Sequence, residues 1–72
     1  MDANPDVLIF YAYRYSQEMG KAAEAVIRGS PTAEEVERLY KLVKSDGGKH
    51  LSEDVYLALL DVVRKAAESR HH

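Results

Sequence analysis

The chain has 72 residues, of which 46% are hydrophobic and 31% are charged, and its 12 acidic and 10 basic residues give a formal net charge of -2. This length predicts one domain, over residues 1–70, that buries only about 60% of the surface exposed by the unfolded chain. The even mixture of charges argues against a nucleic-acid-binding protein, because such proteins concentrate basic residues on one face to contact phosphates. Cysteine is absent, which excludes a disulfide framework and a zinc site built from thiolates.

Membrane insertion and secretion have no support in the sequence. The longest apolar run, from Val7 to Tyr13, has seven residues, whereas a membrane-spanning helix needs about 20. No signal-peptide pattern precedes this run. We therefore expect a soluble protein that contacts no membrane, and its cellular location stays open. His71 and His72 look like the remnant of a purification tag on a recombinant protein.

The longest helical pattern covers residues 5–28. Asn4 is a suitable N-cap, Pro5 suits the first helical position, and Asp6 favours the positive end of the helix dipole. Gly29 follows the last residue of the pattern. On a helical wheel, the apolar residues of this segment gather in one sector: Leu8, Tyr11, Ala12, Tyr15, Met19, Ala22, Ala23 and Val26. We expect one unbroken helix that buries all of these side chains.

Two aromatic residues of this segment lie outside the apolar sector. Phe10 is in the middle of the polar face, and Tyr13 is at its edge. The spacing of the residues on this side predicts one continuous strip along the helix, formed by Phe10, Tyr13, Arg14, Gln17 and Lys21. Gly20 lies near the edge of the strip, where it costs about 1 kcal/mol of helix propensity relative to alanine. It predicts a close approach of another group to the backbone there.

A second helix is predicted over residues 32–46. Thr32 and Glu35 have the spacing of a capping box at its start. The sequence Asp46-Gly47-Gly48-Lys49 predicts a turn that ends the helix.

A third helix is predicted over residues 52–69, with Ser52 as its N-cap. Leu57 is the one apolar residue well outside its core-facing sector, beside Asp61 and Arg64. Three amphipathic helices with two short connections predict an all-α fold, an up-down-up three-helix bundle.

The segment between the second and third helices could be compared with a calcium-binding EF-hand loop. Aligning Leu51 with the hydrophobic position of that loop places Lys44 at the first ligand and Val55 at the bidentate acid. Neither residue can coordinate calcium through its side chain. The segment is therefore interpreted as a turn between helices.

His50 has Asp46 and Asp54 near it in the sequence, which is the only hint of a metal site or a general base. One histidine without a second histidine or a cysteine is more typical of a surface loop. We expect no catalytic residues, no bound metal and no cofactor, and hence a protein that is not an enzyme.

Regular charge spacing and clean helix caps extend over the whole chain. Charged pairs separated by four residues stabilise the surfaces of the second and third predicted helices, as in Glu34–Arg38, Glu37–Lys41 and Asp61–Lys65. Together with alanine-rich helix ends, glycine loops and the final His-His pair, this style resembles that of computationally designed three-helix mini-proteins. The resemblance implies a scaffold that presents one helix to a chosen protein surface. Gly20, the five tyrosines and Phe10 depart from that style.

The sequence supports two hypotheses about function. In the first, the chain is a protein-binding module, a monomer, whose target is a protein of unknown identity such as a receptor ectodomain or a viral glycoprotein. Aromatic residues and arginine dominate the energetics of interfaces. The predicted binding residues therefore lie on the outer face of the first helix and at its margins, extended by one residue of the third helix: Phe10, Tyr13, Arg14, Gln17, Ile9, Gly20, Lys21 and, on the third helix, Leu57. In the second hypothesis, the chain is a scaffold or a self-associating bundle without an external target, and the exposed apolar residues bury against a second copy.

Overall fold

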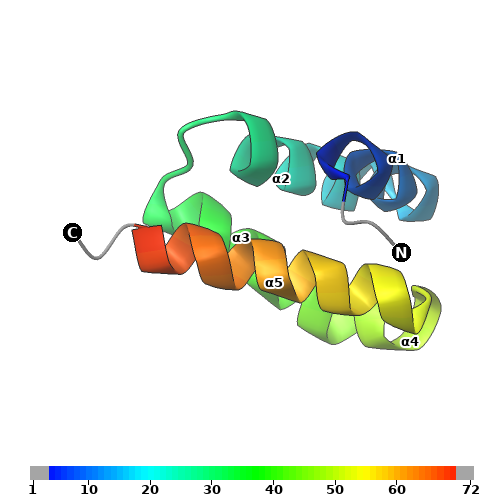
Figure 1. Cartoon of the computed structure of the whole chain (residues 1–72). Coiled ribbons are helices and arrows are strands. Elements are labelled where there is room, and N and C mark those ends of the chain that lie inside the picture. The colour runs from blue at the N-terminus through cyan, green and yellow to red at the C-terminus, as the bar shows by residue number, and fades with distance from the viewer. Residues whose placement is uncertain (1–3, 70–72) are drawn as a thin grey trace.

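In the computed structural model, which describes residues 4–69 and their side chains other than those of residues 46–48, the protein is built from helices, and no strand occurs in this range (Figure 1). Four of the helices have ten residues or more. They are α1 (Pro5–Tyr15), α2 (Gln17–Arg28), α3 (Ala33–Leu42) and α5 (Glu53–Ser69). A π-helix, η1 (Val43–Gly47), and a short α-helix, α4 (Gly48–His50), join α3 to α5. The all-α class is confirmed.

The prediction of one unbroken helix over residues 5–28 is wrong, because the helix breaks at Ser16. This residue has an extended backbone (φ -159°, ψ 154°). Its amide donates to the carbonyl oxygen of Ala12 (3.1 Å), and its Oγ accepts a hydrogen bond from the amide of Met19 (3.0 Å). Ser16 therefore ends α1 and caps α2 at the same time. A helical wheel cannot detect this break, since the apolar periodicity continues through Ser16.

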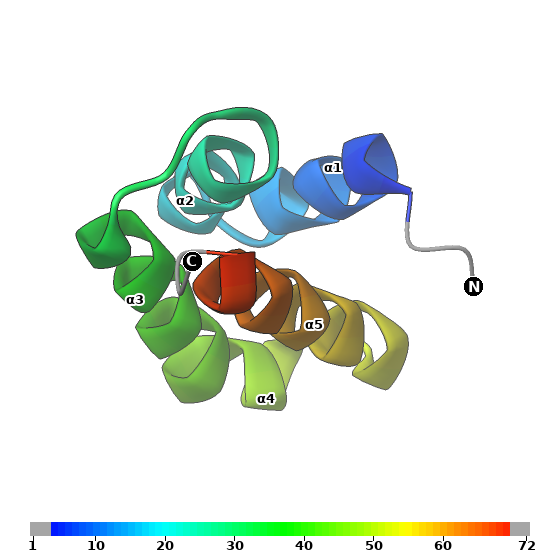
Figure 2. The same ribbon diagram turned by 60° about the vertical axis from the view of Figure 1, so that its left-hand side comes forward.

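The chain folds back at Ser16, so that α2 lies against α1. Asp6, in the first turn of α1, forms an ion pair with Arg28 in the last turn of α2. In a straight helix these two residues would be about 33 Å apart. We call the two helices the α1–α2 pair. It forms one layer above α3 and α5 (Figures 1 and 2). The finer prediction of an up-down-up three-helix bundle is not confirmed, because four long helices are present.

The core lies between these two layers, and all four long helices contribute to it. Its largest fully buried side chains come from α1, α2, α3, η1 and α5: Leu8, Met19, Leu39, Val43 and Leu59. Burying a side chain of this size stabilises the fold by about 1.5–3 kcal/mol. The radius of gyration, 10.9 Å, is close to the value of about 11 Å expected for a folded chain of this length.

The predicted N-caps of α3 and α5 are confirmed. Thr32 and Glu35 form both hydrogen bonds of the capping box, at 3.1 and 2.9 Å. The Oγ of Ser52 accepts a hydrogen bond from the amide of Val55 (3.4 Å).

The prediction that the helix ends at residues 46–49 is wrong. The helical backbone continues through Gly47 and Gly48 as η1 and then α4, and it ends only after His50. No glycine in the described range has a positive φ, so the left-handed helix cap that glycine favours is not used here.

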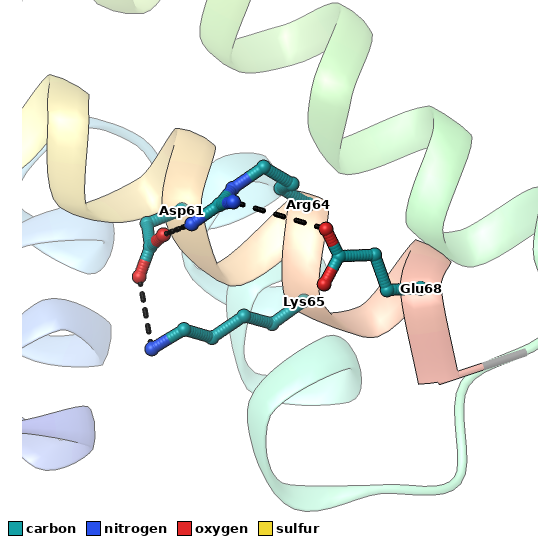
Figure 3. Close-up of polar contacts among 4 residues, drawn as sticks. All are labelled: Asp61, Arg64, Lys65 and Glu68. Carbon is teal, nitrogen blue, oxygen red and sulfur yellow. Dashed lines mark hydrogen bonds and ion pairs between the residues drawn. The ribbon is translucent and has the colours of Figure 1, made fainter.

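The outer face of α5 carries a chain of ion pairs (Figure 3). Asp61 contacts Arg64 and also Lys65, the latter at 3.1 Å as its spacing predicts, and Arg64 reaches Glu68 at 3.7 Å. The hydrogen bond from Arg64, and then that from Lys65, lowers the pKa of Asp61. Because these groups are exposed, water screens them and their contribution to stability is small.

Two further predicted pairs lie on α3. Lys41 pairs with Glu37 as predicted, at 3.2 Å. Arg38 pairs instead with Glu18 of α2, at 3.3 Å, so this charge links two helices.

Candidate interaction surface

One side of α1 exposes a cluster of apolar side chains. Val7, Phe10, Tyr11 and Arg14 follow the spacing i, i+3, i+4 and i+7, and we call them the α1 face. Phe10 is 57% exposed, Tyr11 is 37% exposed and Val7 is 36% exposed. The Phe10 and Tyr11 rings meet edge to face with their centroids 5.8 Å apart, and the Arg14 guanidinium lies 5.9 Å from the Phe10 centroid. The expected burial of Tyr11 is therefore wrong.

A shallow groove of about 520 Å³ continues this face at the C-terminal end of α1. It lies between α1 and the junction of α4 with α5. Its walls are formed by Tyr11, Arg14, Tyr15, His50, Leu51, Ser52 and Val55. The Tyr15 ring stacks on His50 with centroids 5.6 Å apart and an interplanar angle of 26°. We call it the Tyr15–His50 groove. Tyr11 and Arg14 belong to both features, so the α1 face and the groove form one surface.

Tyr13 has a different role from Phe10. Its ring covers Gly20 of α2 so closely that a Cβ atom at position 20 would lie 2.3 Å from the nearest ring carbons. Its hydroxyl donates a hydrogen bond to Oε1 of Glu24 (2.8 Å), and this bond raises the pKa of Tyr13. The predicted close approach at Gly20 is thus confirmed, and the approaching group is Tyr13. The Tyr13 side chain, although partly exposed, holds α1 against α2.

The predicted strip from Phe10 to Lys21 is not a continuous surface. Gln17 and Lys21 are exposed, but they follow the break and belong to α2. Lys21 lines a separate depression of about 190 Å³ between α2 and α3. Ile9 is buried, as is Gly20 beneath Tyr13. Neither of these two residues adds exposed surface to the α1 face.

Leu57 lies on a different side of α5 from the groove. It is 53% exposed and is in helical register with Asp61 and Arg64. Ser52 and Val55, which line the groove, are on the side of α5 that turns toward α1. Leu57 therefore does not line the groove, and its part in binding stays a prediction.

Sequence reasoning missed Val7, Tyr11 and the stacking of Tyr15 on His50. The signal that could have revealed the first two was Ser16, which has the residue type of an N-cap, two positions before the acidic Glu18. With the helix ended before Ser16, Val7, Phe10, Tyr11 and Arg14 would have been recognised as the i, i+3, i+4 and i+7 positions of a separate short helix. The stacking depends on the path of the chain from α3 to α5, which local periodicity does not encode.

Comparison with known proteins gave no match to a family model, to a curated protein or to a solved structure. Within residues 4–69, no helix has the length and apolar character needed to cross a membrane. Among the side chains that the structure describes, no three of histidine, aspartate or glutamate gather as a metal site would require; Asp46, named above beside His50, lies outside this set.

Proposed function

We propose that this chain is a non-enzymatic protein-binding module that presents the α1 face and the Tyr15–His50 groove to a partner protein. The observation that carries the proposal is the exposed Phe10 ring, with Tyr11 and Arg14 against it. Isolated exposed apolar residues are ordinary, whereas a cluster of them rimmed by polar groups is typical of an interaction site. Phe10 makes its ring contacts on the surface, so packing of the core does not require it.

The arrangement of the side chains supports a specific chemistry for the partner. Phe10 is suited to an apolar pocket, and the guanidinium of Arg14 is suited to a carboxylate at the rim of that pocket, where it can form two parallel hydrogen bonds. The Tyr15–His50 groove offers two stacked rings to a side chain of the partner. We therefore propose a folded protein partner that offers an apolar pocket beside an aspartate or glutamate.

Designed mini-proteins of the kind that this chain resembles present one helix to a chosen protein surface. The helix presented to the partner is α1 alone, which has 11 residues, and α2 supports it from behind. Phe10, Tyr11 and Arg14 then all come from one short rigid element. Rigid presentation favours affinity, because less side-chain and backbone freedom is lost on binding.

The test begins with labelled protein applied to an array of purified protein domains, and the affinity of each binder is then measured. For a genuine partner, we expect Phe10→Ala to weaken binding by at least about 2 kcal/mol, a loss of roughly 30-fold in affinity. The same substitution should change the free energy of unfolding by less than about 0.5 kcal/mol. An affinity that Phe10→Ala leaves unchanged would contradict the proposal.

Tyr40→Ala is the matched control for this experiment. Tyr40 is an aromatic residue with 46% exposure on α3, a helix that packs on α2 and α5. We expect this variant to bind like the unchanged chain. Glu24→Ala is not a neutral control, because Glu24 accepts the hydrogen bond from Tyr13. Light scattering of dilute protein should give the mass of one chain, 8.1 kDa; a dimer that Phe10→Ala dissociates would favour self-association through the α1 face.

A further inference from the structure

The break at Ser16 removes hydrogen bonds that a continuous helix would have. In a helix running through this position, the amides of Gln17, Glu18 and Met19 would donate to the carbonyl groups four residues before each of them. In the folded chain the amide of Met19 donates instead to the Oγ of Ser16. Straightening the chain at this one residue would therefore exchange one side-chain cap for three backbone hydrogen bonds.

The residues on either side of the break are compatible with that straight form. The apolar periodicity of α1 continues into α2 without a change of phase, which is why the sequence predicts one helix. Neither proline nor glycine occurs between Asp6 and Met19, so nothing in this range prevents a helical backbone. The connection between α1 and α2 is one residue long, and a short connection between two elements is a setting in which exchange between molecules can occur.

The contacts of α1 are of the kind that a second copy can supply. Asp6 pairs with Arg28, and Tyr13 packs on Gly20 and bonds to Glu24. In one straight chain, Asp6 and Arg28 would be about 33 Å apart and could not meet. Between two straight chains, α1 of each copy could pack on α2 of the other and form every one of these contacts again.

We propose that two copies of this chain can exchange α1 through straightening at Ser16 and so form a domain-swapped dimer. The dimer retains the monomer's contacts and adds backbone hydrogen bonds at both hinges. Association of two chains also costs translational and rotational freedom, so the protein concentration sets the ratio of dimer to monomer. Phe10 stays exposed in the exchanged form. A swapped dimer would thus present two α1 faces and could bind a multivalent partner more tightly than the monomer does.

Ser16→Ala tests the proposal because it removes the cap and places the strongest helix-forming residue at the hinge. We expect its dimer dissociation constant, from light scattering over a concentration series, to be at least about tenfold lower than that of the unchanged chain. Ser52→Ala is the matched control, since it removes the cap of α5 and leaves the hinge intact. We expect that variant to remain as monomeric as the unchanged chain. Equal dimerisation by both variants, or by neither, would overturn the proposal.

A second measurement identifies the exchange itself. The chain has no cysteine, so Asp6→Cys and Arg28→Cys can be placed in two separate Ser16→Ala chains, which are then mixed. We expect a disulfide between the two chains, because exchange brings position 6 of one copy to position 28 of the other. Phe10→Ala in both chains should leave this disulfide in place. A dimer that forms no such disulfide, or that Phe10→Ala abolishes, would show association through the surface instead.

Should Ser16→Ala fail to fold, the same cysteine pair can be placed in chains that keep Ser16. These chains are unfolded, mixed at about 1 mM to favour association by mass action, and refolded together. We expect the disulfide between chains to form under these conditions and to be rare after refolding at about 1 μM. Its absence at the higher concentration would contradict the exchange of α1.

Discussion

Of the three junctions between the long helices, the one from α1 to α2 and the one from α3 to α5 are built in opposite ways. At the first, α1 passes to α2 through Ser16 alone, without help from a glycine or a proline. At the second, α3 passes to α5 through residues 43–52, and the helical backbone continues across two adjacent glycines before it ends. Residue types would predict the reverse, with a break at the glycines and continuity at the serine.

The difference shows that packing and capping decide where these helices end. Ser16 can leave the helix because its Oγ satisfies the amide of Met19 and because Gly20 lets Tyr13 approach the backbone of α2. Gly47 and Gly48 weaken a helix but do not stop it, since neither adopts the left-handed conformation that would cap it. A residue with low helix propensity ends a helix only where caps and packing make a non-helical backbone more stable at that residue.

The largest expected effect tests whether α1 belongs to the core as fully as α5 does. Leu8 of α1 is 1% exposed and Leu59 of α5 is fully buried. We expect Leu8→Ala and Leu59→Ala each to lower the free energy of unfolding by about 2–5 kcal/mol, measured by chemical denaturation. If α1 were a detached arm, Leu8→Ala would cost less than about 1 kcal/mol while Leu59→Ala kept its full effect.

A smaller effect contrasts the glycine of the α1–α2 pair with a glycine of the second junction. We expect Gly20→Ala to destabilise the fold by about 1–2 kcal/mol, because overpacking against Tyr13 outweighs the gain in helix propensity. Gly48→Ala should stabilise it by about 0.4–1 kcal/mol, since the backbone of Gly48 is already helical. Denaturation curves measure both changes.

A double-mutant cycle assigns the cost at Gly20 to its neighbour. In a Tyr13→Ala background the ring is gone, and Gly20→Ala should become neutral or stabilising. If Gly20→Ala remained equally harmful without Tyr13, the close contact between α1 and α2 would not be its cause.

The smallest expected effects are changes of stability with pH, and they differ between Tyr13 in the α1–α2 pair and Asp61 on α5. The hydrogen bond to Glu24 raises the pKa of Tyr13 above its ordinary value of 10.0. The contribution of this hydrogen bond to the free energy of unfolding is therefore complete below pH 10, and it is lost as the pH rises through the raised pKa. The hydrogen bond from Arg64 lowers the pKa of Asp61 below 3.8. The contribution of Asp61 is therefore complete above that pH and is lost as the pH falls through the lowered value.

NMR titration of each group measures these shifts. Glu24→Ala should return the pKa of Tyr13 toward its ordinary value without moving that of Asp61. Arg64→Gln should do the converse. A substitution that moved both pKa values would mean that the two regions are coupled.

Much of the fold followed from local patterns. The all-α class and the caps at Thr32 and Ser52 were predictable because a cap depends on residues within one turn of itself. Gly20 also gave a correct signal, since an unfavourable residue in a helix indicates a packing reason. The fold-back at Ser16 was not predictable from periodicity, because it depends on contacts between residues as distant in sequence as Asp6 and Arg28.

The candidate surface was predictable in part. Phe10 and Arg14 were identified because α1 alone determines their side of the helix. Gln17 and Lys21 were placed on one unbroken helix with them, but they belong to α2, because the wheel extended across a break that it could not detect. His50 was expected in a surface loop; it is exposed, but it is the last residue of the helix α4. Its stacking on Tyr15 depends on how the second junction packs against α1.

The distance between positions 6 and 28 within one chain tests the central claim, the fold-back at Ser16, most directly. Spin labels on Asp6→Cys and Arg28→Cys, in doubly labelled protein diluted with unlabelled chain, report this distance by pulsed electron paramagnetic resonance. Because the axes of neighbouring helices lie only 8–10 Å apart, we expect a main distance below about 20 Å at low protein concentration. A single distance near 33 Å under the same conditions, the value for a straight helix over residues 5–28, would contradict the account.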